Sequence, residues 1–161
     1  MSIATIEDAA AICAIQNAVI AKSNAIFEEN PRSLADVEVW LTERLDNDWP
    51  VLLAKTDDGE VLGYGTYGPF RDRDGYRITV EHSVHVNDKY RGQGIGSMLL
   101  DALIKKASRD GYKVMVGCID GGNETSLMFH SKHGFAETGR MPGVATKGGD
   151  LLDLVIMQRR L

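Results

Sequence analysis

The chain has 161 residues, 43% of them apolar and 25% charged, which is typical of one globular domain, residues 1–161, with a core of its own. The net charge of −5 argues against nucleic acid and anionic membranes as main partners, and no apolar run approaches the roughly 18 residues of a membrane span. Two distant cysteines, Cys13 and Cys118, and a start without signal-peptide character predict buried thiols in a reducing compartment, the cytoplasm.

The first half of the chain predicts a strand, two helices and three further strands. Asp8 stands near the N-cap position of the first helix, and Ser33 caps the second. The tripeptide Asp57-Asp58-Gly59 is a hairpin-turn signal between two of the strands. The expected strands are Ile3–Ile6, Val51–Lys55, Val61–Tyr67 and Arg77–Val86, and the expected helices run from Asp8 to Ala21 and from Ser33 to Leu45.

A glycine-rich loop then joins the last of these strands to a helix that begins near Gly94. Glycines at positions 92, 94 and 96 let backbone N–H groups converge, the helix N-terminus is positive, and Arg91 adds a formal charge. These features predict a site for a diphosphate-bearing cofactor.

Two familiar phosphate motifs fit this loop poorly. A dinucleotide fingerprint would need glycine or alanine where Ser97 stands, although Asp120 lies near the usual distance for a ribose ligand, so this alternative is weakened and stays open. A P-loop would need a Gly-Lys-Ser/Thr ending, which is missing. The spacing that matches is R-x-x-G-x-G, from Arg91 to Gly96.

The second half of the chain predicts a helix with an apolar stripe that ends at Gly111, followed by strands and one short helix. The glycine-rich stretch Pro142–Asp150 is expected to be a mobile loop. The remaining expected elements are the strands Val114–Ile119, Phe135–Arg140 and Leu152–Arg159 and the helix Glu124–His133.

The R-x-x-G-x-G loop and the order of elements resemble the GNAT superfamily of acetyl-CoA-dependent N-acetyltransferases over essentially the whole chain. The resemblance implies an α/β (α+β) GNAT fold, with a mixed, mostly antiparallel sheet of six to seven strands flanked by four helices. It also implies acetyl-CoA as cosubstrate, with no metal. The positions that match cofactor-binding residues of the superfamily are Val84, His85, Val86, Arg91, Gly92, Gln93, Gly94, Ile95, Gly96, Ser97, Asn123 and Ser126.

The segment Pro69–Val84 points to one branch of that superfamily. It contains F-R-x-R, a tyrosine and T-V-E, and so resembles the phosphinothricin and methionine sulfoximine acetyltransferases. Two stretches differ from the usual pattern of the branch. Residues 147–153 lack the aromatic side chains common there, and His85 replaces the tyrosine of a V-Y-V strand end.

Acetyl transfer to an amine needs a base, a stabilised oxyanion and a protonated leaving thiol. The resemblance implies that Glu81 of T-V-E is the general base. The alternative is that Glu81 is an ordinary strand carboxylate that faces solvent and has no catalytic role. A backbone N–H at the strand bulge expected over Val84–Val86 would hold the oxyanion. His130 occupies the position of a superfamily tyrosine that protonates the thiolate, although a packing or surface histidine is equally compatible with the sequence.

Arg71 and Arg73 are candidates to clamp a carboxylate, phosphinate or sulfoximine group through bidentate contacts. Alternatively, Asp72 and Asp74 neutralise them in a solvated turn. Three further positions match residues that line the amino-acid pocket of the branch: Phe27, Tyr76 and Thr79.

The sequence therefore predicts an N-acetyltransferase that acts on a methionine-like amino acid, with family members commonly forming homodimers. An acetyltransferase for a polyamine, an aminoglycoside or a peptide N-terminus is one alternative, and the paired arginines argue against a polycation. A CoA-binding sensor without catalysis is the alternative from another class.

Overall fold

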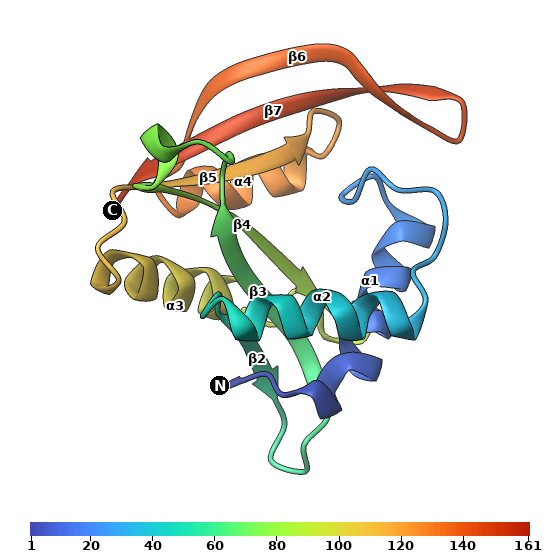
Figure 1. Ribbon diagram of the computed structural model, residues 1–161. Coiled ribbons are helices and arrows are strands. Elements are labelled where there is room, and N and C mark those ends of the chain that lie inside the picture. Colours follow the sequence, from blue (N-terminus) through green and yellow to red (C-terminus); the bar gives the residue numbers. More distant parts are fainter.

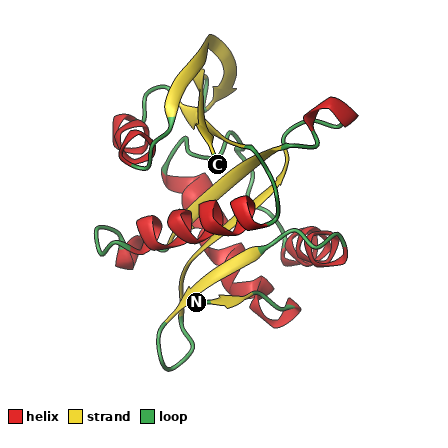
Figure 2. Ribbon diagram, turned by 90° about the vertical axis from the view of Figure 1, so that its left-hand side faces the viewer, coloured by secondary structure: helices red, strands yellow, loops and turns green.

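Seven strands form one sheet in the order β1-β2-β3-β4-β5-β7-β6, and only the β4–β5 pair is parallel. The computed structural model describes residues 1–161, and helices lie on both sides of the sheet (Figures 1 and 2). This architecture confirms the fold implied by the resemblance. The bounds are β1 Ser2–Ile3, α1 Ala9–Lys22, α2 Leu34–Asp46, β2 Val51–Lys55, β3 Val61–Pro69, β4 Thr79–Val86, α3 Ile95–Arg109, β5 Val114–Asp120, α4 Glu124–Lys132, β6 Ala136–Lys147 and β7 Asp150–Arg160.

The sheet separates two apolar cores because side chains alternate along each strand. In β2, Leu52 and Ala54 pack with α3 and β5, whereas Val51 and Leu53 pack with α1 and α2. Each core lies between one face of the sheet and the helices that cover it. No helix combines the length and the apolar character that a membrane span requires.

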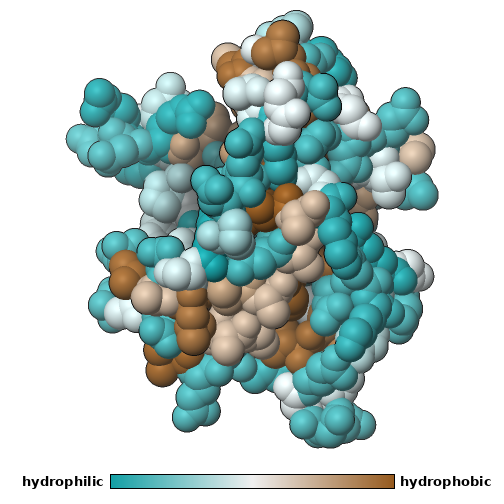
Figure 3. Space-filling view, turned by 90° about the vertical axis from the view of Figure 1, so that its right-hand side faces the viewer, coloured by the Kyte–Doolittle hydropathy of each residue, from teal (hydrophilic) through white to brown (hydrophobic).

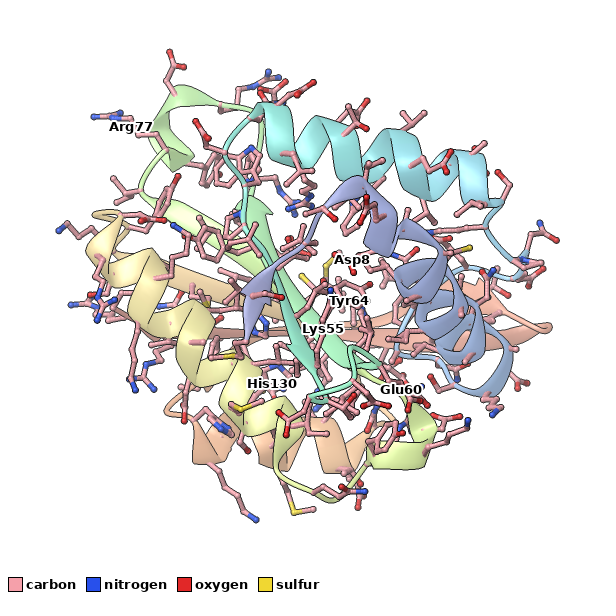
Figure 4. All side chains as sticks on the ribbon, turned by 90° about the horizontal axis from the view of Figure 1, so that it is seen from below. Asp8, Lys55, Glu60, Tyr64, Arg77 and His130 are labelled. Carbon is pink, nitrogen blue, oxygen red and sulfur yellow. The ribbon has the colours of Figure 1, made fainter.

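Local signals account for most element boundaries. Ser33 caps α2 with a reciprocal pair of bonds, because its Oγ accepts from the Asp36 N–H and the Asp36 carboxylate accepts from the Ser33 N–H. The expected hairpin turn at residues 57–59 joins β2 to β3. Asp8 precedes α1 without capping it; its carboxylate instead pairs with Lys55 at 2.7 Å. Both residues are labelled in Figure 4.

The expected loop at 142–150 is wrong. Strand β6 continues to Lys147 and β7 starts at Asp150, so the segment forms the end of a long hairpin that turns at Gly148 and Gly149. Both glycines have positive φ, which suits this tight turn. The glycines of this segment indicated a loop. The sequence does not reveal the register shift between Met141 and Ala145 that lets the irregular strand stay paired.

The tip of this hairpin lies above the segment that follows α1 (Figure 1). The Lys147 ammonium donates to three backbone carbonyls there, those of Ile20, Ser23 and Ile26, at 2.7–2.9 Å. The Gly148 N–H donates to the Glu29 carboxylate at 2.8 Å. A cation at the C-terminal end of α1 satisfies carbonyls that the helix leaves free and opposes the negative end of its dipole.

Replacing Lys147 by Met should therefore destabilise the fold by about 1–3 kcal/mol, because the three carbonyls lose a charged donor. Urea unfolding of K147M measures the loss. K105M is the matched control, because Lys105 is an exposed lysine of α3. Equal midpoints for K147M and the unchanged protein would show that Lys147 does not hold this segment.

Candidate active site

The two parallel strands at the centre of the sheet pair over only three residues each. Thr79, Val80 and Glu81 of β4 pair with residues 114–116 of β5, and beyond Glu81 the strands separate. From that point, alternate backbone groups of β4 face the gap without a strand partner. A cavity of about 370 Å³ lies at this split and is lined from both sides of the sheet.

Glu81 lies at the point of separation and faces the cavity. Burial raises the pKa of its carboxyl group above the ordinary 4.5, while a hydrogen bond with Cys118 and the charges of Arg71 and Arg44 oppose that rise. A carboxylate with a raised pKa in a cleft is suited to take a proton near neutral pH. The Cys118 thiol is half-buried beside it, and burial together with Glu81 raises the pKa of Cys118 to about 12, which keeps it protonated.

Arg44 of α2 enters the same cavity, and the sequence did not reveal it. Its guanidinium donates to the Tyr67 carbonyl at 2.8 Å and to the Thr66 hydroxyl at 3.3 Å, and lies over the Trp40 ring. No carboxylate pairs with it in the structure, whereas Arg32, which also lines the cavity, is bonded to Glu28. Gly68 makes room, since a Cβ there would lie 2.6 Å from the Arg44 Nη1.

His82 and His130 occupy the other wall of the cavity, whereas His85 lies beside Tyr64 on the side of Glu81. The Nδ1 of His130 lies 2.7 Å from the Ser126 carbonyl, and because a carbonyl only accepts, Nδ1 carries the hydrogen. Burial lowers the pKa of His130, so the neutral ring presents a lone pair at Nε2. Burial also lowers the pKa of His82 to about 3 and that of His85 to about 4. Figure 4 shows His130 on the side of α3 and α4 and Tyr64 on the side of α1.

The glycine loop has the form expected of an anion site. Gly92 and Gly94 adopt positive φ, of 77° and 80°, and Gly94 is the N-cap of α3. The first helical bond runs from the Met98 N–H to the Gly94 carbonyl, so the N–H groups of residues 95–97 have no helical partner. Arg91 lies beside the loop, held by Asp88 at 2.9 Å. These groups fit a pyrophosphate.

The structure divides the predicted site residues among three places. Glu81, His130, Phe27, Val84, His85, Asn123 and Ser126 line the cavity at the split. Arg71, Arg73, Tyr76 and Thr79 line a second cavity, of about 600 Å³. The remaining positions, Val86 and residues 91–97, lie at the end of β4 and around the start of α3.

Several cavity residues carried no signal in the sequence. Arg44, Trp40 and Tyr64 stand in ordinary amphipathic patterns, and only the fold turns them toward Glu81. His82, which directly follows the T-V-E motif, was not among the predicted site residues. In the structure no group of three or more His, Cys, Asp or Glu side chains is placed to bind a metal ion.

Comparison with known proteins agrees with this geometry. The sequence profile of the acetyltransferase (GNAT) family matches residues 18–135. An L-methionine sulfoximine/L-methionine sulfone acetyltransferase of Pseudomonas aeruginosa is 44% identical over 158 residues, which cover 98% of this chain and 92% of that protein.

Solved structures are similar over nearly the whole chain. A phosphinothricin acetyltransferase from Sinorhizobium meliloti, solved in complex with acetyl-CoA, superposes with a TM-score of 0.95 at 32% identity, covering 99% of this chain and 86% of that one. A ribosomal-protein-alanine N-acetyltransferase from Brucella melitensis superposes with a TM-score of 0.96 at 39% identity, covering 99% and 98%.

The raised pKa of Glu81 predicts how a neutral replacement affects stability. Above the ordinary glutamate pKa of 4.5, the unfolded chain releases this proton more readily than the folded one, so stability falls as pH rises through the folded pKa. E81Q should therefore be more stable than the unchanged protein at pH 7. The gain should almost vanish by pH 4, because Glu81 is then mostly protonated in both states. Urea midpoints at pH 7 and pH 4 measure this difference, and a less stable E81Q at pH 7 would contradict it.

Proposed function

The chain belongs to the GNAT family of acetyltransferases, and from this premise we propose that it transfers an acetyl group to the α-amino group of a methionine-like amino acid. The proposed acceptors are methionine sulfoximine, methionine sulfone, phosphinothricin and methionine. Acetyl-CoA is the donor. The observation that carries the proposal is one cavity that contains a desolvated carboxylate, Glu81, and a guanidinium without a carboxylate partner, Arg44.

This pair of charges is complementary to a zwitterionic amino acid. A buried cation without an anionic partner is unfavourable, and a bound carboxylate would satisfy the donors that Arg44 still has free. The α-ammonium group of the same molecule would then lie on the side of Glu81. A polyamine or an aminoglycoside has no carboxylate for Arg44, so these acceptors are disfavoured.

The reaction moves two protons from the ammonium nitrogen. Glu81 takes the first, and the neutral amine attacks the thioester carbon. At residues 84–86, β4 pairs regularly with β3, without the expected bulge, so only the N–H groups of Val84 and Val86 face the gap, and these would stabilise the oxyanion. When the C–S bond breaks, sulfur keeps the electron pair, and His130 takes the second proton from nitrogen at its Nε2 lone pair and gives it to sulfur. His130 thus acts as the acid only after acting as a base, because Nδ1–H is committed to Ser126.

The donor would be held by the glycine loop. Residues 91–97 offer free N–H groups and a guanidinium to the pyrophosphate, and Asn123 and Ser126 line the cavity through which the pantetheine arm would reach the split strands. Asn123 also caps α4, since its side chain accepts from the Ser126 N–H at 3.0 Å.

The far end of the acceptor would be recognised at the second cavity. Arg71 and Arg73 line it together with Tyr76 and Thr79, and Arg71 is near enough to Glu81 to lower the pKa of that carboxyl. We assign these arginines to the phosphinate or sulfoximine group and Phe27 to the wall of the main cavity.

Two further properties belong to this proposal. A homodimer in the cytoplasm is expected, and the β6–β7 hairpin supports the dimer because it exposes large apolar side chains, those of Met141, Val144 and Leu151. Figure 3 views the molecule from the right-hand side of Figure 1 and shows apolar surface at the top, where the hairpin lies. Exposed apolar groups on an edge strand are typical of an interface.

Free-thiol release from acetyl-CoA tests the acceptor class. Methionine sulfoximine, methionine sulfone, phosphinothricin and methionine should be acetylated, and spermidine, an aminoglycoside and an alanine-initial peptide should not. In E81Q the turnover number should fall by roughly 10²–10⁴-fold. Turnover confined to the peptide or to a polycation would overturn the proposed acceptor, and bound acetyl-CoA without turnover on any amine would favour a sensor.

Replacing Arg44 by Met should raise the KM for methionine sulfone by about 10–100-fold, equivalent to roughly 1.4–2.8 kcal/mol, with the KM for acetyl-CoA little changed. For 3-(methylsulfonyl)propylamine, the same molecule without its carboxylate, the KM values of wild type and R44M should differ little. R44K keeps a charge, so its KM for methionine sulfone should lie between those of wild type and R44M. R73A is the companion variant and should affect phosphinothricin more than methionine. An equal effect of R44M on both amines would exclude Arg44 as the carboxylate ligand.

A further inference from the structure

His82 is the one buried side chain whose polar atoms lack a hydrogen-bond partner in the protein. It is 5% exposed, and neither Nδ1 nor Nε2 is bonded. A neutral imidazole has one N–H donor and one lone pair, and leaving them unpaired in a core is unfavourable. His82 also lines the cavity, at the first position of β4 beyond the last pairing with β5.

The ring of His82 faces His130 across a narrow space beside Gly117. Their ring centroids are 5.1 Å apart. A Cβ on Gly117 would lie 3.1 Å from the His82 Nε2 and 3.3 Å from the His130 Nε2. Gly117 is a strand residue without a positive φ, so the absence of a side chain, and not backbone freedom, is what it contributes here.

Both nitrogens therefore lie close to one point, where a single water molecule could bond to both. The site offers such a water two polar partners and adjoins the cavity. The direction of each bond follows from His130. Its Nε2 is a lone pair, so the water donates to it, and the His82 Nε2–H donates to the water.

We propose that His82 is a positioning residue for His130, and that it acts through a water molecule held in the space beside Gly117. The second hydrogen of this water points into the open part of the cavity. The proton that His130 takes from the substrate nitrogen passes through this water: the water oxygen accepts it, and the hydrogen that the water donates to His130 moves to Nε2. When the C–S bond breaks, His130 returns a proton to the water, and the water gives one to sulfur. His82 keeps its own hydrogen throughout. The inference rests on the role of His130 under the proposed function.

The alternative is that His82 only fills space in the core, where it packs against Phe135. The two roles predict opposite outcomes for an apolar replacement. If His82 only packs, H82M should change stability and leave the rate alone. If His82 positions the water, H82M should lower the rate while stability is unchanged or higher, because an unpaired buried polar ring has been removed.

The experiment compares H82M, H82Q and G117A by steady-state kinetics and thermal unfolding. In H82M, kcat should fall by about 10–100-fold, part of the contribution of general acid–base catalysis, with both KM values within about twofold. H82Q keeps an N–H donor near the same place and should retain most of the activity. In G117A the added methyl group fills the space, so kcat should fall as it does in H82M. The double variant H82M/G117A should be no slower than the slower single variant, because both changes remove the same interaction.

A second readout does not depend on activity. In protein labelled with ¹⁵N-histidine, the Nε2 resonance of His130 should shift when its lone pair loses the hydrogen bond, and H82M and G117A should cause the same shift. H133M is the matched control, because His133 of the neighbouring turn bonds the Phe129 carbonyl and does not line the cavity. Its kcat should stay unchanged, and the His130 Nε2 resonance should not show the shift that H82M and G117A share.

The outcomes separate this inference from the proposed role of His130. A wild-type kcat in H82M, additive losses in the double variant, or an H82Q as slow as H82M would overturn the positioning role of His82. If H130M also turned over at the wild-type rate, the role of His130 itself would be wrong. A slow H130M together with a fully active H82M would leave His130 in the mechanism and remove His82.

Discussion

The separation of β4 from β5 after three residue pairs is the constraint on which the site depends. A continuous sheet would cover its own backbone groups and keep the two faces apart. Where the strands separate, unpaired N–H groups face a cavity, and side chains from opposite faces reach it: Glu81 from one and His82 from the next position along the strand. Because successive residues of a strand point to opposite faces, only such a split brings a base and a histidine pair to one place.

The site is assembled at the expense of local stability. Glu81 is a carboxylate whose charge burial disfavours, Arg44 is a guanidinium without a counter-ion, and His82 is a buried ring without a partner. Each would be better satisfied by a bound molecule than by the protein alone. Functional sites commonly retain such unfavourable groups, because a ligand supplies the missing interaction when it binds.

The fold could be predicted because its signals are local and periodic. The R-x-x-G-x-G loop, the Ser33 cap and the turn at residues 57–59 each determine a boundary from a few neighbouring residues. The hairpin, which was predicted wrongly, and Arg44, which was not predicted, depend on contacts between residues far apart in the sequence. The hairpin at 142–150 is held by its register and by the bonds of Lys147 to the end of α1. Arg44 of α2 enters the cavity because Gly68 of β3 leaves it room.

These distant contacts also connect the hairpin to the acceptor pocket. The carbonyl that Lys147 bonds at Ile26 immediately precedes Phe27, which lines the cavity, and Gly148 binds Glu29 in the same segment. Related enzymes often have aromatic residues in the stretch 147–153, but here the hairpin reaches the pocket through a lysine and backbone N–H groups. The hairpin thus borders the cavity in two ways, through the segment that carries Phe27 and through Leu154 of β7, which lines the cavity itself. Changes in the hairpin should consequently alter acceptor fit and segment stability together, because one set of hydrogen bonds carries both.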